Sequence, residues 1–120
     1  MILFFIRTFN DLDHITPVVY RLAGYSSEPI RVFCQNPSFD INNDFRLKFL
    51  KENVNNLELG YIYSLKKPVH ALPGDKLELQ EFDENWAKIL FEELKPSALV
   101  FDYVIDSGKF ITGSLLKAAR

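Results

Sequence analysis

The sequence predicts an α/β domain of the Rossmann-like type, with a four-stranded parallel sheet in the order 3-2-1-4 and helices on both faces. Two observations predict this class. Apolar, strand-like runs alternate with helical patterns along the chain, which is typical of parallel strands joined by crossover helices. The first run, Ile2 to Ile6, is apolar at every position. Such a run indicates a strand covered on both faces, in the middle of the sheet.

Length and composition narrow the class of protein further. The 120 residues are predicted to form one domain, and the net charge of −2 gives no basic excess for nucleic acid or an anionic membrane. The one cysteine, Cys34, excludes an internal disulfide and lies in an apolar run, so we expect a small core residue. No apolar run is long enough for a membrane span, and the N-terminus does not resemble a signal peptide. The expected location is cytoplasmic.

The first strand is followed by polar residues from Arg7 to His14, predicted to be a loop. A helix is then expected, with Thr16 as its cap and Pro17 at the first helical position. Gly24 is a natural helix terminator. In open α/β sheets a loop in this place lies at the carboxyl edge, where ligands bind.

The middle of the chain repeats the strand–helix pattern. A second strand is predicted at Ile30–Cys34, and a helix follows from a cap at Asp44 to about Glu52. The residues expected on the inner side of this helix are Phe45, Phe49 and Leu50, with Arg46, Lys48 and Lys51 outward. Leu57–Leu65 is predicted to be the third strand.

The last third contains a long irregular segment and a final strand–helix unit. Residues 66–82 are expected to form a loop, with a short helix near residues 76–80. A helix is predicted from Asp83 to Lys95, ended by Pro96, with Trp86, Ile89, Leu90 and Leu94 on its apolar side. The fourth strand is expected at Ala98–Ile105 and the last helix at Lys109–Arg120. Since such sheets usually have five or six strands, we expect the domain to be incomplete at this end.

The usual signatures of cofactor and metal sites are absent from the sequence. It contains no P-loop, no glycine-rich dinucleotide fingerprint, no nucleophile elbow and no closely spaced Cys or His pair. The segment after the first strand has no glycine, which disfavours close approach of a pyrophosphate to the backbone. We therefore expect neither a cofactor nor a metal ion.

Polar residues nevertheless gather where the first and fourth strands end. Arg7, Asn10, Asp11 and His14 follow the first strand, and Asp102 and Asp106 accompany the fourth. Because parallel strands end at one edge, His14, Asp102 and Asp106 are expected to converge there. A histidine can act as a general base near neutral pH when a carboxylate orients its ring.

Structural roles for the same residues remain open. His14 could belong to the helix N-terminus and hydrogen-bond Asp11 or Thr16. Asp102 could cap the last helix or accept main-chain N–H bonds. Arg7 could bind a carboxylate or phosphate of a ligand, or could pair with Asp11 or Asp13.

The segment Asp13-His14-Ile15-Thr16-Pro17 and the helix after it resemble the first loop and helix of GT-B glycosyltransferases. Many of those carry Gly-His, two residues and Pro ahead of a helix that ends in Leu-Ala; here Asp13 replaces the Gly. CDP-glycerol glycerophosphotransferases and nucleotide-sugar 2-epimerases have a similar layout. The resemblance implies that His14 takes the proton of the acceptor hydroxyl and that Asp102 holds this histidine. Arg7, Asn10, Asp11 and Asp106 would then contact the acceptor.

The resemblance extends over the order of elements in all 120 residues, but only over the acceptor-side half of a two-domain enzyme. It implies a sugar or polyol-phosphate acceptor, a role in cell-surface glycan or polymer synthesis, no metal, and a nucleotide-sugar domain that this sequence lacks. The chain is expected to be inactive by itself. Its apolar fourth strand and last helix predict dimerisation through that edge, or marginal solubility. The alternative is a non-catalytic α/β binding or regulatory module. A receiver-like domain fits less well, since the acidic cluster and the lysine of receivers are not laid out here.

Overall fold

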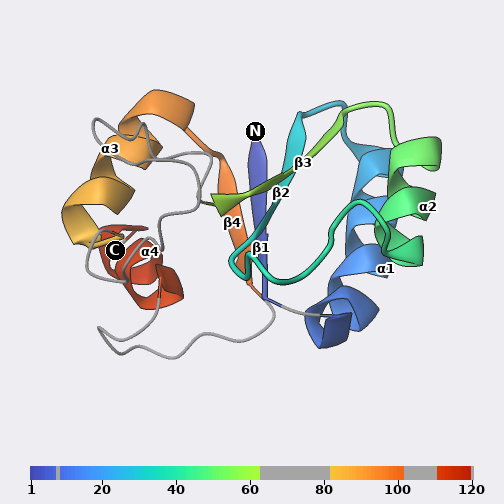
Figure 1. Cartoon of the computed structure of the whole chain (residues 1–120). Helices are drawn as coiled ribbons and strands as arrows, with labels where there is room; N and C mark the ends of the chain where they lie inside the picture. The colour runs from blue at the N-terminus through green and yellow to red at the C-terminus, as the bar shows by residue number, and fades with distance from the viewer. Residues whose placement is uncertain (8, 63–81, 102–110, 120) are drawn as a thin grey trace.

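The structure, a computed structural model, describes residues 1–7, 9–62, 82–101 and 111–119. A parallel sheet forms the middle layer, and two helices cover each face (Figure 1). This arrangement confirms the predicted fold class. The elements in chain order are β1 (Ile2–Ile6), α1 (Phe9–Tyr25), β2 (Ile30–Cys34), α2 (Phe45–Asn53), β3 (Leu57–Tyr61), α3 (Glu84–Leu94), β4 (Ala98–Phe101) and α4 (Ile111–Ala119).

The sheet has the strand order β3-β2-β1-β4, as the sequence predicts. β1 pairs with both of its neighbours in parallel, and Phe5 lies opposite Phe33 on β2 and Phe101 on β4. All five residues of β1 are buried, since it has a strand on each side and helices on each face. β4 is at one end of this order. Dimerisation through β4 and α4 stays a prediction.

Alternate residues of β1 point into two separate cores. Ile2, Phe4 and Ile6 pack with the helices α1 and α2 on one face of the sheet. Leu3 and Phe5 pack on the other face with α3 and α4, including Leu115. The aromatic ring of Phe5 stacks on that of Phe101, with centroids 5.0 Å apart. The central strand thus contributes to both cores of the domain.

Helix α1 begins at Phe9, so the prediction of a loop through His14 is wrong. Thr16 and Pro17 lie inside the helix, where Pro17 has no N–H to donate to the carbonyl of Asp13. The physical reason for the early start is Leu12, which begins the buried stripe of the helix: Leu12, Ile15 and Val19. Burying Leu12 against the sheet needs a helical turn ahead of Thr16.

The cap of α2 is confirmed, but the predicted inner side of this helix is partly wrong. The Asp44 carboxylate accepts hydrogen bonds from the main-chain N–H groups of Arg46 and Leu47. Leu47 and Leu50 are the buried residues of the helix, whereas Phe45 and Phe49 are exposed. Phe49 instead packs its ring on Tyr20 of α1, 5.3 Å away at the molecular surface.

The remaining elements match the predictions over the described residues, except that β3 ends at Tyr61 although the predicted third strand includes Ile62. Asp83 caps α3, and Lys95, with a φ angle of 47°, ends it before Pro96. Ile89 on that helix is exposed rather than turned toward the sheet. The predicted short helix at 76–80 and the predicted ends of the third and fourth strands, residues 63–65 and 102–105, lie outside the described residues. Within the described ranges, no helix is both long and apolar enough to cross a membrane.

Candidate functional site

Two adjacent strands of the sheet are followed in the chain by helices that lie on opposite faces of the sheet. β1 and β4 are neighbours, yet β1 leads to α1 on one face and β4 leads to α4 on the other (Figure 1). In open α/β sheets, connections that diverge in this way leave a crevice outside the strand ends, and ligands bind there. The ends of β1 and β4 are therefore the candidate site.

An ion pair between Arg7 and Asp11 lies directly at the end of β1. The guanidinium donates two hydrogen bonds to the carboxylate, from Nε to Oδ2 at 3.2 Å and from Nη2 to Oδ1 at 3.0 Å. The main-chain N–H of Arg7 donates a third to Oδ2, at 2.7 Å. Asp11 is only 2 % exposed, whereas the Arg7 side chain is 40 % exposed. Of the two roles left open for Arg7, pairing with Asp11 is thus realised.

This pair also ties the start of α1 to the end of β1. Asp11 lies in the first turn of the helix, where a carboxylate is favoured by the helix dipole. It reaches back to the residue that follows the strand, so the strand–helix connection is held by three hydrogen bonds to one side chain. The exposed part of the guanidinium has a restricted orientation as a result.

Cys34 is the residue at the end of β2, beside this pair. Its Sγ lies 3.4 Å from the carbonyl oxygen of Asn36 and 3.8 Å from that of Arg7. The side chain is fully buried, and this burial raises the pKa of the thiol to about 11. The thiol is therefore protonated at neutral pH and is a poor nucleophile. This confirms the prediction of a core residue.

The other predicted site residues fall into two groups. Asn10 and His14 are exposed on the first two turns of α1. Asp102 and Asp106 lie outside the described residues, so the predicted approach of these carboxylates to His14 stays a prediction. Arg7 and Asp11 are brought together at the edge.

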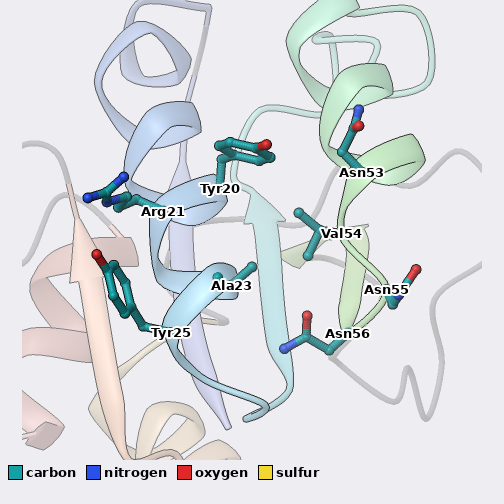
Figure 2. A pocket seen from close by; sticks show the side chains of 9 residues that line it. Tyr20, Arg21, Ala23, Tyr25, Asn53, Val54, Asn55 and Asn56 are labelled. Carbon is teal, nitrogen blue, oxygen red and sulfur yellow. The ribbon is translucent and has the colours of Figure 1, made fainter.

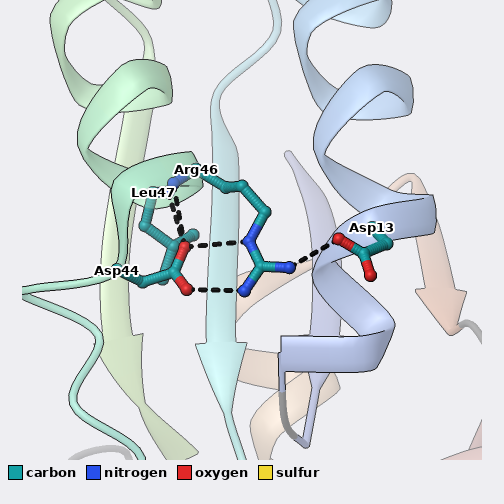
Figure 3. A network of polar contacts seen from close by, with 4 residues as sticks. All are labelled: Asp13, Asp44, Arg46 and Leu47. Carbon is teal, nitrogen blue, oxygen red and sulfur yellow. Dashed lines mark hydrogen bonds and ion pairs between the residues drawn. The ribbon is translucent and has the colours of Figure 1, made fainter.

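A second polar network joins α1 to α2 and was not expected, because Arg46 was predicted to point outward (Figure 3). The Arg46 guanidinium donates from Nε to Asp44 Oδ1 at 3.2 Å and from Nη2 to Asp44 Oδ2 at 2.7 Å. Its Nη1 donates to Asp13 on α1. The Arg46 and Asp44 side chains are largely buried, while that of Asp13 is exposed. The spacing of Asp44 and Arg46 at a helix start is a signal in the sequence for the Asp44–Arg46 pair. The contact of Arg46 with Asp13 on α1 depends on the fold.

Burial by itself would raise the pKa of Asp44. The hydrogen bonds from the Arg46 guanidinium and from the main-chain N–H groups of Leu47 and Arg46 outweigh this effect, so the pKa of Asp44 lies below its ordinary value. A carboxyl group whose pKa is lower in the folded protein than in the unfolded chain stabilises the fold above its unfolded pKa. That contribution is lost as the pH falls through the folded value.

Asp44→Ala is expected to lower the free energy of unfolding by about 1–2 kcal/mol, because it removes the cap of α2 and a partner of Arg46. Asp44→Asn retains a capping oxygen and is expected to cost less. Urea unfolding from about pH 7 down to about pH 2 measures the difference between the wild type and Asp44→Asn. The difference should shrink toward zero at the acid end. A difference that does not change with pH would contradict the role given to the carboxylate charge.

The described part of the chain has no group of three or more His, Cys, Asp or Glu side chains placed to hold a metal ion. No family model, curated protein or solved structure matches the chain.

Proposed function

We propose that this chain is the acceptor-side α/β domain of a glycosyltransferase-like or glycerophosphotransferase-like protein of cell-surface glycan or polymer synthesis. Its acceptor would bind at the carboxyl edge, between the ends of β1 and β4. The observation that supports this proposal is that α1 and α4, the helices that follow these two neighbouring strands, lie on opposite faces of the sheet. The resemblance of residues 13–17 and the following helix to GT-B enzymes supplies the reaction class.

In this proposal each polar residue at the edge has a role. The acceptor hydroxyl oxygen forms the new bond to the transferred group, the bond to the donor's nucleotide phosphate breaks, and the phosphate leaves with the electron pair. His14 takes the proton of the hydroxyl, and Asp102 orients the imidazole ring. Arg7, Asn10 and Asp106 bind the acceptor, and Asp11 acts through Arg7. The donor would be held by a second domain.

The two residues of the Arg7–Asp11 pair have different roles in this proposal. Because Asp11 is buried and bonded to Arg7 through both oxygens, its contribution is to hold the guanidinium in place. The accessible part of Arg7 supplies the positive charge that a polyol phosphate would need. Asn10 and His14 are exposed one and two turns into α1, where they can meet a ligand without disturbing the core.

A test is a titration of the isotope-labelled chain with sn-glycerol 3-phosphate, followed by amide NMR shifts, with glycerol as a second probe. Shifts are expected at the ends of β1 and β4, and the phosphate probe should bind more tightly than glycerol. Asn10→Ala and His14→Gln should weaken binding by about 2–10-fold, as expected for one lost hydrogen bond. Val18→Ala, exposed on the same helix, is the control. Shifts confined to another surface, or no shift at millimolar probe, would contradict the proposal.

The second candidate, a non-catalytic binding module, is favoured by one observation. The Asp11 carboxylate, near the end of β1, is already hydrogen-bonded to Arg7. This part of the edge therefore has a structural role that needs no ligand. The two candidates differ in the role of His14. Probe binding at the edge that is unchanged by His14→Gln would favour the module, since a base must contact the acceptor.

A further inference from the structure

A groove lies at the opposite end of the molecule from the candidate site, between the last turn of α1 and the segment that joins α2 to β3 (Figure 2). Its volume is about 540 Å³, within the usual range for small-molecule sites. The residues that line it are Tyr20, Arg21, Ala23, Gly24, Tyr25, Asn53, Val54, Asn55 and Asn56. We propose that this groove binds a neutral saccharide. The proposed transfer reaction requires neither this ligand nor this site.

An aromatic wall on α1 supplies one side of the groove. The Tyr20 side chain extends from α1 with its hydroxyl end toward the side of the segment 53–56, and the residue is 50 % exposed (Figure 2). It is held by the ring of Phe49, which packs against it in a tilted arrangement with the ring planes 54° apart. The face of an aromatic ring carries negative partial charge, which attracts the weakly positive C–H groups on the face of a sugar ring. A ring that is already held also loses little entropy when a ligand binds.

The opposite side of the groove presents amide oxygens. The Asn53 Nδ2 donates to the carbonyl of Phe49 at 2.7 Å, and the Asn56 Nδ2 donates to the carbonyl of Glu28 at 2.6 Å. Only the nitrogen of an amide can donate to a carbonyl, so these bonds determine which way each amide points. Both Oδ1 atoms are thereby oriented as acceptors. Hydroxyl groups are the donors that match them.

The charges around the groove disfavour an anionic ligand. Both α1 and α2 end there, and the C-terminal end of a helix carries negative partial charge. The last turn of α1 has no basic residue. Among the described residues that line the groove, the one cation is Arg21. Its guanidinium lies over the ring of Tyr25, 5.2 Å from the centroid, on the side of α1 away from the segment 53–56 (Figure 2). A phosphate or nucleotide would therefore meet the negative ends of two helices, whereas a neutral polyol would not.

A substitution at Gly24 can fill the groove without disturbing the fold. A Cβ atom at this position would meet nothing within 4 Å, and the φ angle is one that other residues adopt. Gly24→Leu should therefore fold normally and extend into open space beside the ligand. Gly24→Ala is the matched control, because it removes the same glycine from the helix with a much smaller side chain.

The test is a titration of the labelled chain with a panel of methyl glycosides of neutral hexoses and their disaccharides, followed by amide NMR shifts. At least one member is expected to shift the amides of residues 20–25 and 53–56, with millimolar or tighter affinity. Tyr20→Ala should weaken this binding by about tenfold and Gly24→Leu should abolish it. Gly24→Ala and Val18→Ala should leave it within about twofold, and melting temperatures check that each variant is folded.

Three outcomes would overturn the proposal. They are a panel in which no member shifts these amides, binding that survives Gly24→Leu in a folded variant, and binding by sn-glycerol 3-phosphate or a neutral tripeptide in preference to every sugar. The result is independent of the transferase proposal, because the two sites lie at opposite ends of the strands. Shifts at the ends of β1 and β4 test that proposal, and shifts at residues 20–25 and 53–56 test this one.

Discussion

Replacing Phe4 by alanine is expected to lower the free energy of unfolding by about 3–5 kcal/mol, the usual cost of a buried Phe→Ala change. Phe4 is 0 % exposed, in the middle of the central strand, and packs against the core beneath α1 and α2. The neighbouring strands prevent the backbone from collapsing into the cavity. Since small domains are stable by about 5–15 kcal/mol, the variant should be close to unfolding at room temperature.

Urea unfolding followed by circular dichroism measures this change. The matched control is Phe45→Ala, the same substitution at a side chain that is 74 % exposed on α2. The control should cost at most about 1 kcal/mol, because the residue is mostly exposed and its ring lies beside the guanidinium of Arg46, 5.0 Å from the ring centroid. Equal costs at the two positions would contradict the placement of Phe4 in the core.

Arg7→Met is expected to lower the free energy of unfolding by about 2–3 kcal/mol, because it leaves the Asp11 carboxylate buried without its charged partner. Methionine retains most of the apolar stem of arginine, so the lost packing is small. This loss of stability is expected to be smaller than that from breaking a fully buried ion pair, because the guanidinium is partly exposed to water. The measurement is again urea unfolding at neutral pH.

A double-mutant cycle separates the ion pair from packing. Asp11→Asn removes the charge but retains an oxygen that can accept the main-chain N–H of Arg7, the bond that measures 2.7 Å in the wild type. In this background Arg7→Met should cost less than about 0.5 kcal/mol, since no buried charge is left behind. If Arg7→Met costs the same in both backgrounds, Arg7 stabilises the fold through its stem alone.

The sheet could be predicted from the sequence because its central strand is an uninterrupted apolar run and the neighbouring strands are mostly apolar. A run such as Ile2–Ile6 suits few environments other than a central strand with both faces covered. The helix caps were also local signals: Asp44 and Asp83 accept hydrogen bonds from N–H groups two or three residues ahead. Cys34 was predicted as a core residue from the apolar run around it, and the structure buries it.

Helix boundaries and helix faces required the tertiary structure. The Thr16-Pro17 pair is a strong local start signal, but the gain from packing Leu12 on the sheet outweighs it and α1 begins at Phe9. Phe45 and Phe49 are apolar enough for a core, yet the sheet selects Leu47 and Leu50. Local propensity differs among such alternatives by less than the free energy of burying one large side chain.

Some contacts between polar side chains could likewise be predicted from the sequence, and others required the tertiary structure. Arg7 and Asp11 are only four positions apart, and the sequence alone placed their pairing among the open alternatives. The Arg46–Asp13 bond and the groove between Tyr20 and Asn56 join residues more than thirty positions apart in the chain. The amino-acid sequence determined the class of fold, the central strand and the edge at which ligands are expected, because these depend on burial patterns along the chain. Only the tertiary structure decided which side chains meet between α1 and α2, because such contacts depend on how two helices are rotated against the same sheet.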